Sequence, residues 1–151
     1  MGITIQTRPF GEIEIQERQL IDFPDGILGF DYVKQFALLD TPNGNSPLKW
    51  LQAIGEPELA FVIIRPADFM VRYELLVSST DLDAVGAQSP EGILVFAIVT
   101  IPANPAEMTA NLQGPIIINP VTRLGRQAIS LSDTYRVRHN ILEEMKKAAK
   151  G

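Results

Sequence analysis

Short runs in which apolar and polar side chains alternate mark the first part of the chain. Ile3 and Ile5 alternate with polar neighbours, and Ile13 and Ile15 alternate with glutamates and a glutamine. A repeat of two is the pattern of a half-buried strand, because successive strand side chains point to opposite faces of the sheet. Residues 8–11, Arg-Pro-Phe-Gly, have the composition of a turn. The pattern therefore predicts a hairpin made of the first two strands.

Further strands are predicted by apolar, β-branched or aromatic runs that Gly and Pro interrupt. The predicted strands cover residues 36–39, 48–54, 59–64, 73–77, 93–99, 116–118 and 127–131, with a turn at residues 42–45 and another at Gly125. Residues 93–99 are apolar at every position, which is typical of a strand that is buried on both faces.

Helix is scarce in the pattern. Residues 80–85 could form one or two turns that end at Gly86, with Asp81 and Asp83 as solvated acids at the start. A better helix follows Asn140, whose side chain can cap the chain at Glu143 and start a helix over about residues 141–149. The predicted fold is therefore mainly β: a compact, antiparallel, barrel-like single domain over residues 1–151 with a short C-terminal helix.

The composition adds three limits. A chain of 151 residues suits one domain with one core. It has no cysteine, so disulfides and thiolate metal sites are excluded. The first residues lack the pattern of a secretory signal, and the apolar run at 93–99 is far shorter than the roughly 20 residues of a membrane helix. We expect a cytoplasmic protein that has no membrane partner.

The charge is distributed unevenly along the chain. The net charge is −5, but residues 1–107 carry 15 acidic and 6 basic side chains, whereas residues 108–151 carry 3 acidic and 7 basic ones. Because nucleic-acid affinity depends on neutralising phosphates, the acidic part argues against direct nucleic-acid binding. It favours a basic partner, which the field of the protein would steer.

Few residues offer chemistry. The single histidine, His139, lies next to cationic neighbours and outside any recognisable nucleophile motif, so we expect a structural role and no catalytic residue. Asp81 and Asp83 lack the other ligands of a calcium loop, and no phosphate-binding glycine loop is present. The sequence predicts neither a metal nor a cofactor.

Several segments, in order along nearly the whole chain, resemble the FliW family. They are residues 11–15 and 23–31, residues 48–52 and 57–61, residues 99–102 and 108–119, and residues 125–129 and 135–139. The resemblance implies a small β-barrel-like fold and no enzymatic activity. It also implies two protein partners: flagellin, and the RNA-binding regulator CsrA, whose block on flagellin translation the free protein relieves. We expect the free protein to be a monomer.

The candidate partner contacts come from predicted loops and from exposed charge. The loop over residues 102–115 contains three prolines, which lower the cost of ordering it on binding. The candidates are Phe30, Asp31, Tyr32, Glu74, Ile101, Pro102, Met108, Thr109 and Asn111. In the alternative interpretation the chain is a small β-barrel that binds a ligand such as a nucleotide second messenger. Two arginine pairs, at residues 123/126 and 136/138, are the candidates for its phosphates.

Overall fold

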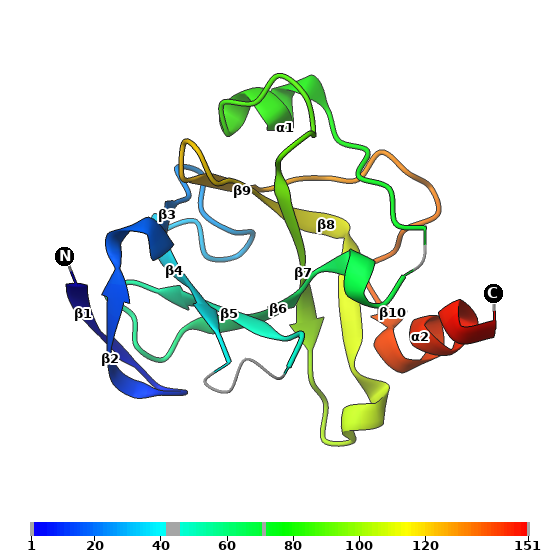
Figure 1. The fold of residues 1–151 in the computed structure, drawn as a ribbon, viewed down its shortest axis with the longest axis horizontal. Helices are drawn as coiled ribbons and strands as arrows, with labels where there is room; N and C mark the ends of the chain where they lie inside the picture. The colour runs from blue at the N-terminus through cyan, green and yellow to red at the C-terminus, as the bar shows by residue number, and fades with distance from the viewer. Residues whose placement is uncertain (1, 42–45, 71, 151) are drawn as a thin grey trace.

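Figure 1 shows how the strands and helices follow one another along the chain, with long connections between β3 and β4 and between β9 and β10. The computed structural model describes residues 2–41, 46–70 and 72–150, and the turn expected at residues 42–45 lies outside them. The strands are β1 (Gly2–Thr7), β2 (Gly11–Gln16), β3 (Leu20–Asp22), β4 (Gln35–Asp40), β5 (Lys49–Ala53), β6 (Ala60–Ile64), β7 (Leu94–Thr100), β8 (Thr109–Asn119), β9 (Leu124–Gln127) and β10 (His139–Asn140). The helices are α1 (Ser79–Ala84) and α2 (Ile141–Lys150), and three 3-10 turns are η1 (Glu17–Gln19), η2 (Pro66–Asp68) and η3 (Pro105–Glu107).

Seven strands of the described residues close into a barrel, in the order β8-β7-β6-β5-β4-β3-β9 with β9 paired again to β8. Neighbouring strands are antiparallel except β3 and β9, which run parallel and meet at Asp22 and Leu124. The backbone N–H of Asp22 also donates to the carbonyl of Arg123 at 2.9 Å. Closure leaves these strands without a free edge. The predicted mainly β, barrel-like fold is confirmed.

The side chains of each barrel strand alternate between the inside and the outside. In β8, Ile116 and Ile118 belong to the central core cluster, while Ile117 between them packs outside with the cluster around α1. In β7, Phe96 belongs to the central cluster and its neighbour Ala97 to a second, outer cluster. The expectation that β7 is buried on both faces is confirmed, because elements outside the barrel cover its outer side.

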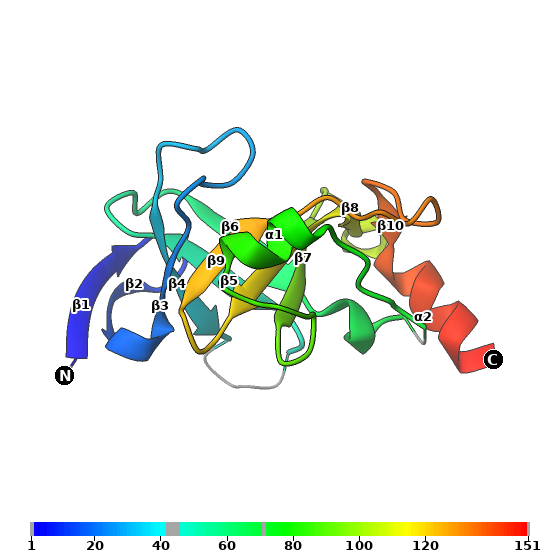
Figure 2. The same cartoon turned by 90° about the horizontal axis from the view of Figure 1, so that it is seen from above.

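The predicted hairpin is present as β1 and β2, which form a separate two-stranded sheet. Gly11 at the start of β2 has a φ of +70°, a conformation that favours glycine after a tight turn. Ile5 and Ile15 pack with Ala37 and Leu39 of β4. The hairpin therefore covers the outer face of β4, and it lies opposite α2 along the long axis of the molecule (Figures 1 and 2).

Both helices begin at side-chain caps. The hydroxyl of Ser78 accepts the N–H of Asp81 at 3.1 Å, and the side-chain oxygen of Asn140 accepts the N–H of Glu143 at 2.9 Å. Gly86, with a φ of +74°, follows the end of α1. The two predicted helices are confirmed at these positions. None of the helices in the described part of the chain has the length and apolarity needed to cross a bilayer.

Three predicted strand features are wrong. Residues 73–77 form no strand: Leu75 and Val77 pack against the cluster around α1, but Leu76 makes a single backbone bond to Leu131 instead of a continuous ladder. Gly125 lies inside β9, paired with Ile118, and the turn comes earlier, at residues 120–123. The strand predicted over residues 127–131 is displaced: β9 ends at Gln127, and residues 128–131 lie outside it. Leu76, Ile129 and Leu131 are exposed, so the apolar runs of residues 73–77 and 127–131 do not mark buried strands.

The predicted loop over residues 102–115 is also shorter than expected. Thr109 already pairs with Thr100 of β7, and Asn111 pairs with Ile98, so both candidates lie on β8. Pro115 sits within β8, where the register with β7 shifts between Phe96 and Ile98. Such an irregularity tolerates a residue that has no N–H to donate to the ladder.

Candidate protein-binding pocket

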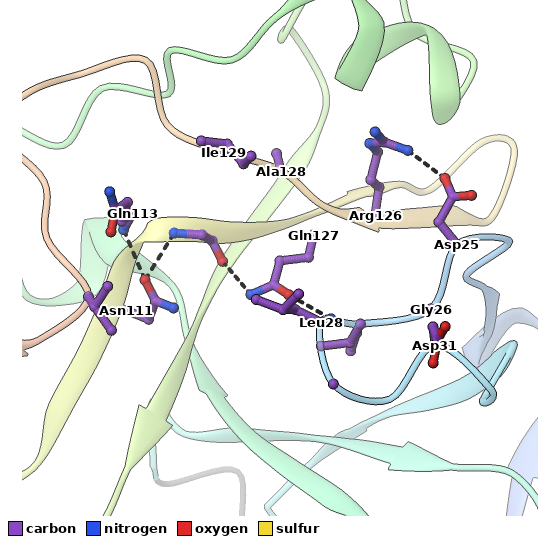
Figure 3. Close-up of a pocket in the computed structure, with 14 residues that line it drawn as sticks. Asp25, Gly26, Leu28, Asp31, Asn111, Gln113, Arg126, Gln127, Ala128 and Ile129 are labelled. Atoms are coloured by element: carbon purple, nitrogen blue, oxygen red, sulfur yellow. Dashed lines mark hydrogen bonds and ion pairs between the residues drawn. The ribbon is translucent and has the colours of Figure 1, made fainter.

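A pocket with a volume of about 890 Å³ opens where the loop between β3 and β4 meets the strands β8 and β9. We call it the β8–β9 pocket. Its lining residues are Asp25, Gly26, Ile27, Leu28, Gly29, Asp31, Asn111, Gln113, Gly114, Arg126, Gln127, Ala128, Ile129 and Val137 (Figure 3). The loop that supplies the first six of them projects from the barrel (Figure 2).

Side-chain amides organise the floor of the β8–β9 pocket. The side-chain oxygen of Asn111 accepts the backbone N–H groups of Gln113 and Gly114, at 3.0 and 2.9 Å. The amide of Gln127 donates to the carbonyl of Gly114 at 3.2 Å and accepts the N–H of Leu28 at 3.0 Å (Figure 3). One glutamine of β9 therefore bridges β8 to the projecting loop.

The neighbouring residue, Arg126, holds the same loop by charge. Its guanidinium pairs with the carboxylate of Asp25 in the loop and, through Nε at 2.7 Å, with the carboxylate of Asp81 in α1. Asp81 is only 7% exposed and also accepts the N–H of Ile129 at 3.4 Å. The expectation that Asp81 is a solvated acid is therefore wrong, because a buried carboxylate requires a partner and Arg126 supplies it.

Gly26 lets the projecting loop turn back on itself. Its φ is +67°, and a Cβ built on it would lie 2.4 Å from the Cα of Asp31. Gly29 has a φ of +87° with open space around it. The two positive φ values and the one backbone–backbone contact give the loop a defined shape.

Apolar side chains stand exposed around the pocket. Leu28 is 87% exposed, Ile129 is 69% exposed and Val137 is 52% exposed. Single exposed apolar residues are common on protein surfaces, but three that line one pocket from separate segments are typical of an interaction site.

The structure separates the nine candidate contacts into groups. Asp31 and Asn111 line the β8–β9 pocket. Tyr32 is exposed in the same loop, whereas Phe30 is half-buried, with its ring centroid 5.3 Å from that of Phe61. Glu74 is exposed on the irregular segment before α1 and does not line the pocket.

The remaining candidates lie away from the pocket. Ile101 is exposed after β7, and Pro102, Met108 and Thr109 are half-buried around η3 and the start of β8. Met108 packs against the outer cluster that contains Ile141 of α2. None of these four lines the β8–β9 pocket. Met108 is therefore partly committed to the fold, which weakens its case as an exposed anchor.

Sequence reasoning missed most of the pocket lining, including Leu28, Gln113, Gln127, Ile129 and Val137. A signal was available, because each of these residues falls in a segment that carries the family resemblance: residues 23–31, 108–119, 125–129 and 135–139. These segments are far apart in sequence. They meet through the pairing of β9 with β8, the bond from Leu28 to Gln127, and the bonds from β8 to the carbonyl of Arg136.

His139, the first residue of β10 and close to the start of α2, is buried at 4% exposure. Its Nε2 accepts the N–H of Arg136 at 2.8 Å, and its Nδ1 lies 3.9 Å from a carboxylate oxygen of Glu144. Burial lowers the pKa of His139, Glu144 opposes that shift, and Arg136 adds to it. The histidine is not among the pocket residues, and its burial agrees with the structural role expected from the sequence.

Of the two arginine pairs proposed for a nucleotide site, the pair Arg123 and Arg126 is occupied by the protein itself, and Arg136 and Arg138 are exposed and do not line the pocket. Arg126 is bound by two carboxylates, and Arg123 donates to the backbone carbonyl of Glu17 at 2.9 Å. The carboxylates of Asp25 and Asp31 line the same pocket. This arrangement is unfavourable for a phosphate group, which needs unneutralised donors.

Comparisons with known proteins agree with the resemblance in the sequence. The family model described as "FliW protein" matches residues 4–141. The chain is 44% identical over 146 residues to the flagellar assembly factor FliW of Leptospira biflexa, covering 96% of this chain and 95% of that protein. It is 40% identical over 146 residues to the protein of the same name from Treponema denticola, covering 97% and 98% of the two chains.

A solved structure supports the same assignment. The crystal structure of a flagellar assembly factor FliW superposes with a TM-score of 0.83 at 34% identity, covering 92% of this chain and 96% of that one. The barrel, the family model and the long alignments therefore agree over almost the whole length. The chain belongs to the FliW family of flagellar assembly factors.

Proposed function

We propose that this chain couples flagellin synthesis to filament assembly by binding two proteins in turn, flagellin and the regulator CsrA. Flagellin that accumulates in the cytoplasm occupies the chain. When flagellin is exported, the freed chain binds CsrA and relieves its repression of flagellin translation. No chemical step is required of the chain in this scheme, which acts by binding alone.

The observation that carries this proposal is the β8–β9 pocket with its exposed apolar rim. Leu28, Ile129 and Val137 are costly to leave in water, and binding a protein would bury them. The pocket is braced before any partner arrives, since Gln127 and Arg126 already hold its loop. Such a surface suits the binding of a protein segment better than it suits a phosphate ligand.

The charge of the chain supports a basic partner of the CsrA type. The net charge of −5 arises from the acidic excess in residues 1–107. An acidic surface accelerates the encounter with a basic protein and disfavours RNA binding. The chain would therefore bind CsrA and not the flagellin mRNA that CsrA represses. Mass action then makes the switch work, provided that flagellin and CsrA do not bind productively at the same time.

Calorimetry with purified components tests the proposal. The chain is expected to bind CsrA and to bind flagellin, and excess flagellin is expected to reduce the amount of CsrA bound. A panel of nucleotides serves as the control, because the alternative interpretation requires that one of them bind. Binding of a nucleotide without binding of either protein would contradict the proposal and favour the small-ligand barrel.

A further inference from the structure

The β8–β9 pocket has a composition that narrows what it can hold. Its exposed apolar rim comes from three segments: Leu28 in the loop after β3, Ile129 just after β9, and Val137 before β10. The lining also includes three amide side chains, those of Asn111, Gln113 and Gln127. An occupant must therefore be amphipathic, with apolar side chains for the rim and polar groups for the amides.

The charges in the pocket favour a cation. Asp25 and Asp31 both line the pocket, and both are exposed. The one basic lining residue, Arg126, is already shared between Asp25 and Asp81, so its charge is offset within the protein. Among the described residues Asp31 has no ion-pair partner. A Lys or Arg of a partner would complete a pair with Asp31.

Two other occupants fit less well. A phosphate-bearing ligand would meet the carboxylates of Asp25 and Asp31 and an arginine that is already paired. A second copy of this chain would bring another molecule with a net charge of −5 to an acidic pocket. Like-charge contacts of this kind disfavour association.

We propose that the β8–β9 pocket docks a basic amphipathic segment of a partner protein, with its apolar side chains on Leu28, Ile129 and Val137 and a Lys or Arg on Asp31. This inference rests on the proposed function, in which CsrA, an RNA-binding protein, is the partner with the required basic character. It adds the place and the chemistry of that contact. The bracing of the loop by Gln127 and Arg126 lowers the conformational cost of docking.

The apolar part of the proposal is tested by Leu28→Asp, with purified CsrA as the probe and calorimetry as the readout. Leu28 is exposed, so the variant is expected to fold, and a thermal melt checks this. Val121 is the matched control, because it is 89% exposed in the turn before β9 and does not line the pocket. We expect Leu28→Asp to weaken binding by about ten-fold or more and Val121→Asp to change it by less than about two-fold.

The charged part is tested by Asp31→Lys against Glu91→Lys, which makes the same charge change at an exposed residue outside the pocket. At a salt concentration of about 0.15 M, charges that make no direct contact are largely screened. Asp31→Lys is therefore expected to weaken CsrA binding by about five-fold or more, and Glu91→Lys by clearly less.

The outcomes separate this inference from the function on which it rests. If the unaltered chain does not bind CsrA, the proposed function fails, and with it this choice of occupant. If the unaltered chain binds CsrA, and the variants Leu28→Asp and Asp31→Lys bind CsrA as tightly as the unaltered chain does, the function stands and the pocket is not the docking site. Dimerisation of the free chain that Leu28→Asp abolishes would identify the occupant as a second copy and overturn the proposal.

Discussion

Individual glycines determine the shape of the loop that forms one side of the β8–β9 pocket. Gly26 and Gly29 both have positive φ values, but only Gly26 also faces backbone, the Cα of Asp31. A side chain at Gly29 would suffer only the conformational strain of a positive φ. A side chain at Gly26 would suffer the same strain and a steric clash with backbone as well.

We predict that Gly26→Ala destabilises the protein by about 3 kcal/mol, and Gly29→Ala by about 1 kcal/mol. The difference arises because the new methyl group at Gly26 would lie 2.4 Å from a backbone atom that cannot rotate away. Urea denaturation of the two variants and the unaltered protein measures both values. Equal losses of stability would show that the loop relaxes freely around Gly26.

His139 gives a prediction at the same scale that depends on pH. Its pKa is lowered in the folded protein, chiefly by burial, whereas an unfolded chain titrates its histidine near 6.5. Below that pH the unfolded chain binds more protons than the folded one. The stabilising effect of the neutral histidine is therefore complete above about pH 6.5 and is lost as the pH falls through the folded pKa.

The measurement is thermal unfolding of the unaltered protein and of His139→Gln between about pH 7.5 and 5.5. A glutamine oxygen can still accept the N–H of Arg136, but the side chain does not titrate. We expect His139→Gln to be less stable at high pH and the gap to narrow as the pH falls. Carboxylates common to both proteins cancel in the comparison. A gap that stays constant with pH would contradict the prediction.

Among the elements, β9 connects more of the molecule than its four residues suggest. It closes the barrel between β8 and β3, and through Arg126 and Gln127 it also holds α1 and the projecting loop. The pairing of β3 with β9, which closes the barrel, consists of a single pair of residues. The side-chain bonds from β9 therefore supplement a weak backbone pairing.

We predict that Asp81→Ala destabilises the protein by about 2 kcal/mol or more, because it removes a buried carboxylate that Arg126 and the N–H of Ile129 both use. Asp83→Ala is the matched control: it lies on the same helix but is exposed, so the expected change is within about 0.5 kcal/mol. Chemical denaturation measures both. Similar values for the two would show that Arg126 is sufficiently paired by Asp25 alone.

Elements that follow a simple period were predictable from the sequence, and elements that depend on distant partners were not. The hairpin of β1 and β2, the two-sided burial of β7 and the cap at Asn140 follow from local pattern. Residues 73–77 are rich in apolar and aromatic side chains, as a strand would be, yet they form no ladder with a neighbouring strand. The burial of Asp81 was also hidden, since its partner Arg126 is 45 residues away.

The pocket could be predicted only in part for the same reason. Asp31 and Asn111 were singled out from the sequence, but the rim residues Leu28, Ile129 and Val137 were not. An exposed apolar residue looks like a core residue in a sequence, because the pattern gives its polarity and not its exposure. Leu28 reaches the pocket through the bond of its N–H to Gln127, and Ile129 follows β9, which pairs with β8. Val137 is placed by the bonds from β8 to the carbonyl of Arg136.

At the scale of the whole molecule, the acidic excess should act on how fast a basic partner arrives. Glu74 is exposed and lies outside the β8–β9 pocket. A charge that makes no contact in the complex contributes to the field that steers the encounter. It adds little to the free energy that holds the partner once it is bound. Its removal should therefore change the association rate and leave the dissociation rate nearly constant.

We predict that Glu74→Lys slows association with CsrA at low salt by about two-fold or more and weakens the salt dependence of that rate, with dissociation little changed. Asp31→Lys, which removes a carboxylate inside the pocket, should in contrast slow association and also speed dissociation. Stopped-flow binding at several salt concentrations separates the two rates. Association of the unaltered chain that is independent of salt would rule out steering by its net charge of −5. An increase in dissociation for Glu74→Lys as large as that for Asp31→Lys would instead place the interface across the segment before α1, outside the pocket.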